Sequence, residues 1–338
     1  MKKALKTTLL FLKETFKYVI KAWSVAAKVV GSFVLGFIIL IIFIIASASD
    51  AADDGYAGGA VLREGGLDKV AVVRLNGEIM ELDNGTGILD FNPFLITPTR
   101  TRELFQRFAK DDSIKAIVIH INSPGGSVVA SEEIYQQIRA LREIKPVIAS
   151  FGEVSASGGY YIACAADQIV ANPATITGSI GVIAIAPNVS GLYDKLGIEM
   201  TTFKTGQYKD MGSMARAVTE EEQEIFKSIL DDSYGLFVRA IVDGRNMDES
   251  KVRKLADGRI YSGKQARENG LVDKLGGIDT AIDLASDIAN LDNPTVMEYG
   301  TYGWLESFLG SSGSSFLPNS FLNQLAPQRK TGIYFLWN

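Results

Sequence analysis

Short apolar runs alternate with amphipathic stretches along residues 69–295, and this alternation predicts the main elements of the chain. Brief runs rich in β-branched residues are typical of buried strands, whereas apolar positions that recur every three or four residues are typical of helices. Strands that alternate with helices favour an α/β layered domain with parallel pairing. Strands are expected at residues 70–75, 114–122, 146–150, 167–172 and 179–186.

Three helices are expected between these strands. The first follows residue 127, and its apolar positions recur at helical spacing. A short apolar helix is expected within residues 160–167, and a long helix over residues 218–244 begins with a Thr/Glu capping pattern. No internal repeat is visible, so the folded part is one copy of its unit. The apolar positions of the first helix are Ala130, Ile134, Ile138 and Leu141.

One uncharged run is long enough to cross a membrane. Residues 29–48 contain no charged side chain, and a helix of this length spans roughly 30 Å, the thickness of the hydrocarbon core of a bilayer. Lysines precede the run and aspartates follow it, so the positive-inside rule places residues 1–28 in the cytoplasm and the rest outside. A cleaved secretory signal is the alternative, because residues 46–48 have the small-residue pattern of a cleavage site. We expect a retained single-pass anchor in the cell membrane, because the run exceeds the apolar core of most signals.

Composition divides the rest of the chain. Residues 49–68 are rich in Gly, Ala and Asp and indicate a linker, residues 69–295 form the expected folded domain, and residues 296–338 form a C-terminal tail. The tail ends in the apolar sequence GIYFLWN. We expect it to dock on its own domain or on a neighbouring subunit, with contact to the membrane or occupation of a substrate groove as alternatives.

Charge and residue counts exclude several classes of function. Residues 1–48 carry a net charge of +6 and the remainder −11, and an acidic body of this kind argues against binding to nucleic acid. Cys164 is the only cysteine and His120 the only histidine, which excludes an intrachain disulfide and zinc sites with several Cys or His ligands. Neither a Walker A motif nor a G-x-G-x-x-G after the first strand is present. We therefore expect no metal and no nucleotide cofactor.

The remaining candidates for chemistry are hydroxyls at two glycine-flanked junctions between strand and helix. Ser157 precedes Gly158 and Gly159 at the start of the short helix, where free N–H groups and the helix dipole can stabilise an alkoxide and a neighbouring oxyanion. The alternative is that Ser157 is a simple N-cap. At the other junction, Gly125 and Gly126 can expose N–H groups as an anion nest or form a tight turn, and the local sequence favours the turn.

A reactive serine without a histidine needs another base. A lysine can serve when burial lowers its pKa toward the working pH. Lys204 and Lys209 lie in the Gly-containing segment FKTGQYKDMGS, where a lysine is more commonly solvated. The residues alone do not decide between these two lysines.

Five motifs stand out between about residues 70 and 290: INSPGGSV (121–128), SASGGYYIACAAD (155–167), TGSIGV (177–182), TGQYKDMGS (205–213) and IYSGKQARENGLVDKLGG (260–277). Together they resemble the bacterial signal peptide peptidase A family. The resemblance implies a serine/lysine peptidase with a Clp/crotonase-like layered fold of repeated ββα units. It implies that Ser157 is the nucleophile, that Lys209 is the general base and that Ser179 orients the lysine. It further implies that Gly126 and Gly158 donate N–H groups to the oxyanion.

The resemblance also implies partners and an assembly. Members of double length place the lysine and the serine in different repeats, so this single-copy chain is expected to form a homo-oligomeric, octameric ring in which neighbouring subunits share each dyad. The expected substrates are extended apolar peptides, including signal peptides left in the membrane. His120 departs from the family, which commonly has Arg just before this motif, and we interpret it as structural. Two rival functions are a non-catalytic membrane scaffold of the same fold and a crotonase-like acyl-CoA enzyme, the latter disfavoured by the anchor and the acidic body.

Overall fold

The computed structural model describes residues 60–81, 95–300 and the strand at 334–336, together with a few isolated residues nearer the N-terminus. The chain forms two units, Met1–Gly55 and Tyr56–Asn338, and the description below concerns the second. Within it we call residues 183–230 the arm and the other described residues the body.

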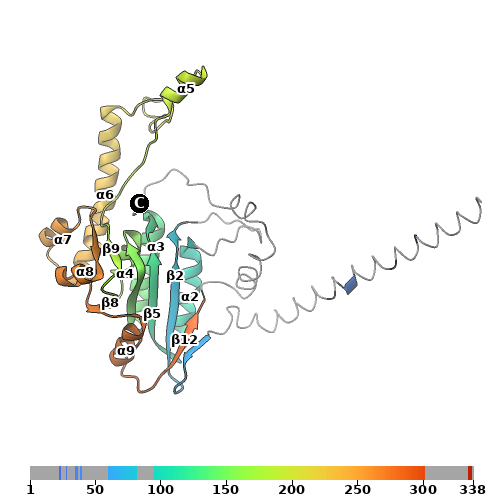
Figure 1. Cartoon of the computed structure of the whole chain (residues 1–338), viewed down its shortest axis with the longest axis vertical. Helices are drawn as coiled ribbons and strands as arrows, with labels where there is room; N and C mark the ends of the chain where they lie inside the picture. The colour runs from blue at the N-terminus through green and yellow to red at the C-terminus, as the bar shows by residue number, and fades with distance from the viewer. Residues whose placement is uncertain are drawn as a thin grey trace, which may run out of the picture. The chain divides into compact units, whose positions relative to one another are not determined.

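A mostly parallel sheet forms the centre of the body (Figure 1). Its strands follow the order β1-β12-β2-β5-β7-β8-β11, and β9 and β10 extend it beside β7. The pairs within β12-β2-β5-β7-β8-β11 and between β7 and β9 are parallel, whereas β1 on β12 and β10 on β9 are antiparallel. The strands are β1 (Ala60–Arg63), β2 (Lys69–Asn76), β5 (Ile114–Ser123), β7 (Val147–Ala156), β8 (Gln168–Ala171), β9 (Ile176–Gly178), β10 (Ile260–Ser262), β11 (Lys274–Leu275) and β12 (Thr295–Tyr299).

The central strands are apolar almost throughout because helices cover both faces of the sheet. On one face Val73, Ile119 and Ala149 pack with helices α2, α3, α4 and α6 in the larger hydrophobic core. On the other face Val72 and Val118 pack against α9 in a smaller core. These helices are α2 (Pro98–Lys110), α3 (Val128–Arg142), α4 (Gly158–Ala163), α6 (Glu220–Arg245) and α9 (Ile278–Ile288), and the shorter helices are α5 (Ser190–Leu196), α7 (Glu249–Leu255) and α8 (Gly263–Asn269).

The sequence predicted most of these elements correctly. The strands expected at 70–75, 114–122 and 167–172 are β2, β5 and β8, and the expected strand at 146–150 is the first half of β7. The first predicted helix is α3, with its four apolar positions buried. The long helix is α6, where Thr219 and Glu222 form the expected capping box.

One strand prediction is wrong. Residues 179–186 form no strand apart from an isolated bridge at Ile183, and the sheet instead receives β9 just before them. Ser179 adopts a positive φ of 50° and turns the chain out of the sheet. Ile183 and Ile185 are then exposed in the arm, so their apolar character does not reflect burial in the sheet.

Two strands of the sheet extend beyond the segment boundaries that were expected from the sequence. β1 lies within the stretch 49–68 that composition indicated as a linker, and it pairs with β12. β12 itself continues the sheet through Tyr299, beyond the expected end of the domain at residue 295.

No helix within the described residues is long and apolar enough to cross a membrane. The span predicted at residues 29–48 lies outside the described residues, except for three isolated positions within it. The cytoplasmic segment predicted at residues 1–28 likewise lies outside them, except for Trp23 and Lys28. Both therefore stay predictions.

Candidate active site

Ser157 occupies a strained junction between β7 and α4. Its φ of 53° and ψ of −118° are unusual for a residue with a side chain, and conformations of this kind concentrate at functional sites. Backbone bonds fix the residue, because its N–H donates to Gly178 O at 2.8 Å and its carbonyl accepts from Tyr161 N at 2.8 Å. Ser157 precedes α4 at the N-cap position, yet its side chain makes no capping hydrogen bond. The simple N-cap interpretation is therefore wrong.

The hydroxyl of Ser157 is buried and has no hydrogen-bond partner among the described residues. A buried hydroxyl without a partner is costly and is uncommon unless it has a function. The serine is thus held rigidly by its backbone while its Oγ atom stays available for chemistry.

Glycines surround this junction because other residues would not fit. A Cβ atom on Gly159 would lie 2.8 Å from Ser123 O, and one on Gly158 would lie 3.2 Å from Gly126 N. α4 therefore packs directly on the backbone that follows β5. The two glycines that the resemblance implied as oxyanion donors, Gly126 and Gly158, are brought together by this close approach.

The segment after Pro124 is a short strand, so the tight turn favoured by the local sequence is wrong. β6 (Gly125–Ser127) is followed at once by α3, whose N-cap Ser127 accepts from Ala130 N at 3.4 Å. A second sheet has the order β13-β6-β3-β4, where β6 pairs in parallel with β3 and antiparallel with β13. The other strands of this sheet are β3 (Glu78–Ile79), β4 (Leu95–Ile96) and β13 (Tyr334–Leu336).

The strand β13 shows that β6 accepts an extended segment along one edge. Phe335 lies opposite Gly126, and Leu336 lies opposite Gly125. The C-terminal segment therefore docks on its own chain, at the strand that carries one implied oxyanion glycine. The sequence left this position open between several alternatives.

Ser179 is linked to Ser157 through the backbone. It follows Gly178, whose carbonyl binds the N–H of Ser157, and its own N–H donates to Arg259 O at 2.8 Å. Ser179 also lines a cavity of about 480 Å³ at the base of α6, together with Lys227, Asp231 and Tyr234. Ser157 itself does not line this cavity, which reaches the candidate site only at Ser179.

Lys209 is exposed and lies in the arm. The adjacent Asp210 binds Arg216 at 2.9 Å, and Arg216 binds the carboxylate of Glu222 in the first turn of α6. Hydrogen bonds from Arg216 and then Lys204 hold the pKa of the Asp210 carboxyl well below its usual range. Lys204, the other candidate base, is 2.7 Å from Asp210 and belongs to the same cluster.

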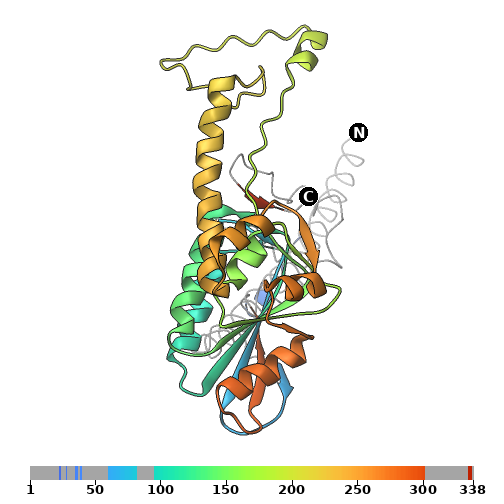
Figure 2. The ribbon, with the colours of Figure 1, turned by 90° about the vertical axis from the view of Figure 1, so that its left-hand side faces the viewer.

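The structure does not bring Lys209 close to Ser157 within one chain. α4 contacts α6 at Phe237, whose ring centroid is 5.1 Å from that of Tyr161, whereas the cluster around Lys209 is attached near Glu222. Fifteen residues of α6 separate Glu222 and Phe237, which is about 22 Å of helix. Figure 2 shows α6 (yellow) rising from the sheet toward the arm.

His120 takes no part in this arrangement. It lies in β5 between Arg74 and Ser150 on the neighbouring strands, and its Nδ1 is 3.3 Å from Ser150 Oγ. Burial and, to a lesser extent, the charge of Arg74 lower the pKa of His120 to about 4. This placement supports the interpretation that His120 is structural.

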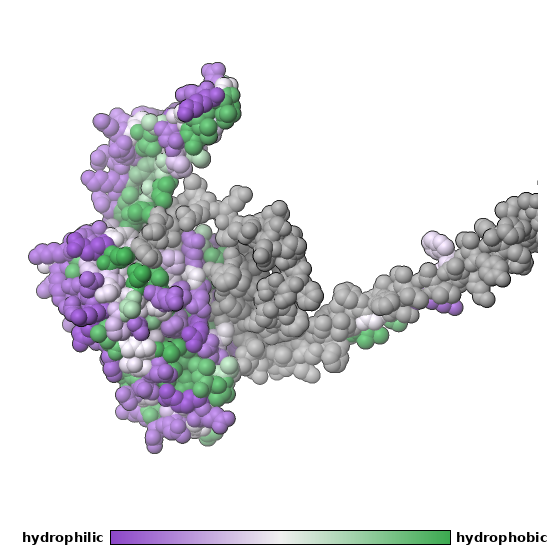
Figure 3. Space-filling model, viewed as in Figure 1, coloured by the Kyte–Doolittle hydropathy of each residue, from purple (hydrophilic) through white to green (hydrophobic). Residues whose placement is uncertain are grey.

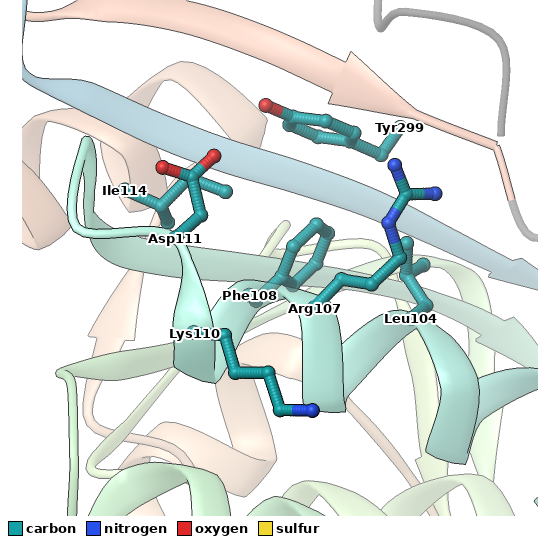
Figure 4. A pocket seen from close by; sticks show the side chains of 7 residues that line it. All are labelled: Leu104, Arg107, Phe108, Lys110, Asp111, Ile114 and Tyr299. Atoms are coloured by element: carbon teal, nitrogen blue, oxygen red, sulfur yellow. The ribbon is translucent and has the colours of Figure 1, made fainter. Parts of the chain in front are cut away.

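A cavity of about 300 Å³ lies at the opposite end of β5 (Figure 4). It is lined by Phe108 and Tyr299, which pack edge to face at 4.9 Å, and by Ile114 at the start of β5. The nucleophile junction is at the other end of that strand, roughly 30 Å away at 3.3 Å per residue. This cavity therefore has no role in the candidate site.

The sequence missed one polar residue of the site, Ser131. It lies on the buried face of α3 between Ala130 and Ile134, and its hydroxyl has no hydrogen-bond partner among the described residues. A polar side chain within an otherwise apolar helix face was the available signal.

Comparisons with known proteins identify the family. Residues 139–292, which include Ser157, Ser179 and Lys209, match the family described as Peptidase family S49. A Synechocystis relative with the provisional name of protease is 48% identical over 186 residues, which cover 55% of this chain and 67% of the relative. A Methanocaldococcus jannaschii relative, also provisionally named a protease, is 38% identical over 242 residues, 70% of this chain and 75% of the relative.

A third relative, from Enterococcus faecium, carries the provisional name signal peptide peptidase SppA and is 41% identical over 209 residues, 61% of each chain. The chain covers only 33% of the Arabidopsis thaliana protein named serine protease SPPA, chloroplastic. The matches to the Synechocystis and Methanocaldococcus jannaschii proteins nevertheless cover two thirds or more of each relative's length. The chain belongs to peptidase family S49, and is a peptidase of the signal peptide peptidase A type.

Proposed function

We propose that this chain is a membrane-anchored serine endopeptidase that cleaves extended apolar peptides, including signal peptides left in the membrane, with Ser157 and Lys209 as a dyad. The observation that carries the proposal is the Ser157 hydroxyl, which is buried without a partner at a strained strand-to-helix junction. The strand–strand–helix succession of β5, β6 and α3 supports a Clp/crotonase-like fold of ββα units.

The reaction is acyl transfer. Neutral Lys209 removes the proton from Ser157 Oγ, which attacks the carbonyl carbon of the scissile bond. The N–H groups of Gly126 and Gly158 hold the oxyanion of the tetrahedral intermediate. The lysine ammonium then protonates the departing amine, and a water molecule hydrolyses the Ser157 ester. Ser179 hydrogen-bonds the lysine and orients it.

In this proposal the lysine comes from a neighbouring subunit of an octameric ring. Lys209 lies near the first turn of α6, too far from Ser157 of its own chain, while the cavity beside Ser179 is open to an incoming side chain. Removal from water beside Ser157 in the assembly would favour the neutral form of the lysine, as a general base requires. The arm around Lys209 exposes apolar side chains that a subunit contact would cover (Figure 3).

The substrate proposal rests on the edge of β6. An extended peptide can add to this edge by main-chain hydrogen bonds, as β13 does, and its alternate side chains then select the sequence. The predicted membrane span at residues 29–48 would hold the groove near the bilayer, where remnant signal peptides emerge.

A mixing experiment tests both the dyad and its division between subunits. Ser157→Ala and Lys209→Ala are each expected to abolish cleavage of a fluorogenic apolar peptide, with folding retained by circular dichroism. Ring assemblies formed from both variants together should recover part of the activity, because some sites then combine an intact serine with an intact lysine. Activity in Ser157→Ala alone would refute the nucleophile, and mixtures that stay inactive would refute the shared dyad.

A further inference from the structure

The first turn of α3 lies between the two elements that carry the oxyanion glycines. β6 ends at Ser127 and α3 begins at Val128, so this turn directly follows Gly126. The same helix also packs extensively on α4, which begins with Gly158. Residues in this turn can therefore control how the two glycines lie relative to one another.

Ser131 differs from the other buried hydroxyls around the site. Ser155 Oγ donates to Ile121 O at 2.6 Å, and Thr177 Oγ1 donates to Ser155 O at 2.6 Å. Ser131 is fully buried, and its Oγ has no partner among the described residues. Among the described residues around the site, Ser157 is the other serine whose buried hydroxyl has no hydrogen-bond partner. An unpaired buried hydroxyl lowers stability, so its presence calls for another explanation.

The Ser131 hydroxyl contacts Gly158. It lies 2.6 Å from the point that a Cβ atom of Gly158 would occupy, and the nitrogen of Gly126 lies 3.2 Å from the same point. The oxygen of Ser131 thus fills the space that a side chain on residue 158 would need. The Ser131 oxygen therefore packs where Gly126 and Gly158, the two implied oxyanion donors, approach each other.

The next residue of α3 reinforces this contact. The Glu132 carboxylate accepts a hydrogen bond from the hydroxyl of Tyr161, one turn after Gly158 in α4. Burial, together with this carboxylate, raises the pKa of Tyr161, so the phenol keeps its proton and the bond persists at ordinary pH. Successive residues of α3 therefore hold both the start and the body of α4.

We propose that Ser131 is a positioning residue for the oxyanion site, which acts through its contact with Gly158. The proposal rests on the proposed function of Ser157. The Ser131 oxygen fixes the Ser157–Gly158 peptide so that its N–H converges with that of Gly126 on the developing oxyanion. A small displacement of these donors weakens transition-state binding more than substrate binding.

Ser131→Ala tests this role in the full chain, assembled as for the activity assay. The variant removes the contact with Gly158 and also removes an unpaired buried hydroxyl. We therefore expect kcat for a fluorogenic peptide to fall about tenfold, KM to change by less than twofold, and the melting temperature to rise. Ser131→Cys retains a polar atom at this position and should lie between the parent and Ser131→Ala in kcat.

Ser286→Ala is the matched control. Ser286 is buried in α9, on the opposite face of the sheet, and its hydroxyl donates to Ile282 O at 2.8 Å. Loss of this satisfied hydroxyl should lower the melting temperature and leave kcat unchanged. A kcat of Ser131→Ala within twofold of the parent, or a loss of kcat accompanied by a lower melting temperature, would overturn the proposal.

Ser157→Ala in the same assay separates the two hypotheses. If Ser157→Ala is inactive while Ser131→Ala is fully active, only the positioning role fails. If Ser157→Ala retains activity, the proposed function itself fails.

Discussion

The body and the arm differ in where they keep their apolar side chains. In the body, Val72, Ile119 and Tyr160 are fully buried between the sheet and its helices. In the arm, Phe203 is 94% exposed and Met200 is 59% exposed. The helix α6 passes from one region to the other, and its buried apolar residues, Phe237, Val238, Ala240 and Ile241, all lie in the half that packs on the body.

This difference supports the proposed assembly, in which a neighbouring subunit would cover the apolar side chains of the arm. Burial of an exposed aromatic or aliphatic side chain stabilises a contact by about 1.5–3 kcal/mol. The arm carries several such side chains and also Lys209, whereas the body carries Ser157. The two halves of the proposed dyad thus lie in the two regions, one with its apolar side chains buried and one with them exposed.

From this contrast between body and arm, we expect the largest effect on assembly and activity from a substitution at Phe203. Phe203→Asp places a charge at the most exposed apolar position of the arm and should prevent assembly, because burial of an unpaired carboxylate is costly. Activity should fall to background as the mass measured by light scattering falls to that of a monomer. Circular dichroism should show an unchanged body.

Leu67→Asp is the control for this prediction. Leu67 is 93% exposed in the body, outside the arm, so the change adds the same charge at a similarly exposed apolar position. It should leave both assembly and activity intact. If Phe203→Asp forms active rings, the arm is not the surface of assembly.

Within the body, the next largest effect is expected at Gly158. An added Cβ would lie 2.6 Å from Ser131 Oγ and 3.2 Å from Gly126 N, so Gly158→Ala must shift the Ser131 hydroxyl and crowd the backbone at Gly126. The expected loss of kcat is about 10²- to 10³-fold, the effect of removing one oxyanion donor. Steady-state kinetics on assembled protein measures it.

Gly235→Ala provides the matched control because a Cβ there would meet nothing within 4 Å. Gly235 lies within α6, where Ala in place of Gly adds about 1 kcal/mol of helix stability. The control should keep its activity and melt at a higher temperature. If Gly158→Ala is equally harmless, the two implied oxyanion glycines are not packed as described.

The sequence predicted the body better than the arm for a physical reason. Strands such as β2 and β5 are buried on both faces, so their apolar runs report burial directly. Residues 179–186 carry a similar run, yet the chain leaves the sheet at Ser179 and exposes Ile185 in the arm. The local pattern of apolar residues does not distinguish a run that is buried in the core from one that is exposed in the arm.

In the candidate site, too, the local sequence did not predict features that depend on contacts between distant segments. The glycines after Ser157 and the strand before it marked this junction as a candidate, whereas the role of nucleophile was implied only by the family resemblance. The tight turn predicted at Gly125 is a strand instead, because β6 pairs with β3 and with β13, contacts that are distant in the sequence. The role of Ser131 depends on the contact between α3 and α4, which no local motif records.

A smaller effect is expected from the C-terminal strand, which occupies the edge of β6 in the body. Deletion of residues 331–338 removes β13 and frees the main-chain groups of Gly125 to Ser127. Cleavage of a short peptide at low concentration should rise several-fold, because the substrate no longer competes with an intramolecular segment. Initial rates of the deletion variant and the parent measure the difference.

A synthetic peptide GIYFLWN added to the deletion variant should restore the inhibition. The control peptide has proline in place of the residues equivalent to Tyr334, Phe335 and Leu336, because proline cannot donate the main-chain hydrogen bonds. Equal rates for the deletion variant and the parent would show that β13 lies outside the path of the substrate.

The smallest effect concerns His120, and it separates the stability of the body from that of the assembly. Burial, aided by Arg74, lowers the pKa of His120 to about 4, whereas an unfolded histidine has a pKa of about 6.5. As the pH falls from 6.5 toward 4, the unfolded state takes up the proton first, so the folded state loses stability over this window. Because His120 is partly solvated, the loss between pH 7.5 and 4.5 should be about 1–2 kcal/mol.

His120→Gln removes this titration, so the variant should lose less stability than its parent over the same window. Urea unfolding at the two pH values measures the difference, and both chains should carry Phe203→Asp so that assembly does not contribute. Carboxylates remote from residue 120 contribute equally in the two chains and cancel in the comparison. An identical pH dependence in the two chains would mean that His120 is as easily protonated in the body as in the unfolded chain. The neutral form of His120, between Arg74 and Ser150, would then contribute nothing to the free energy of unfolding of the unassembled chain.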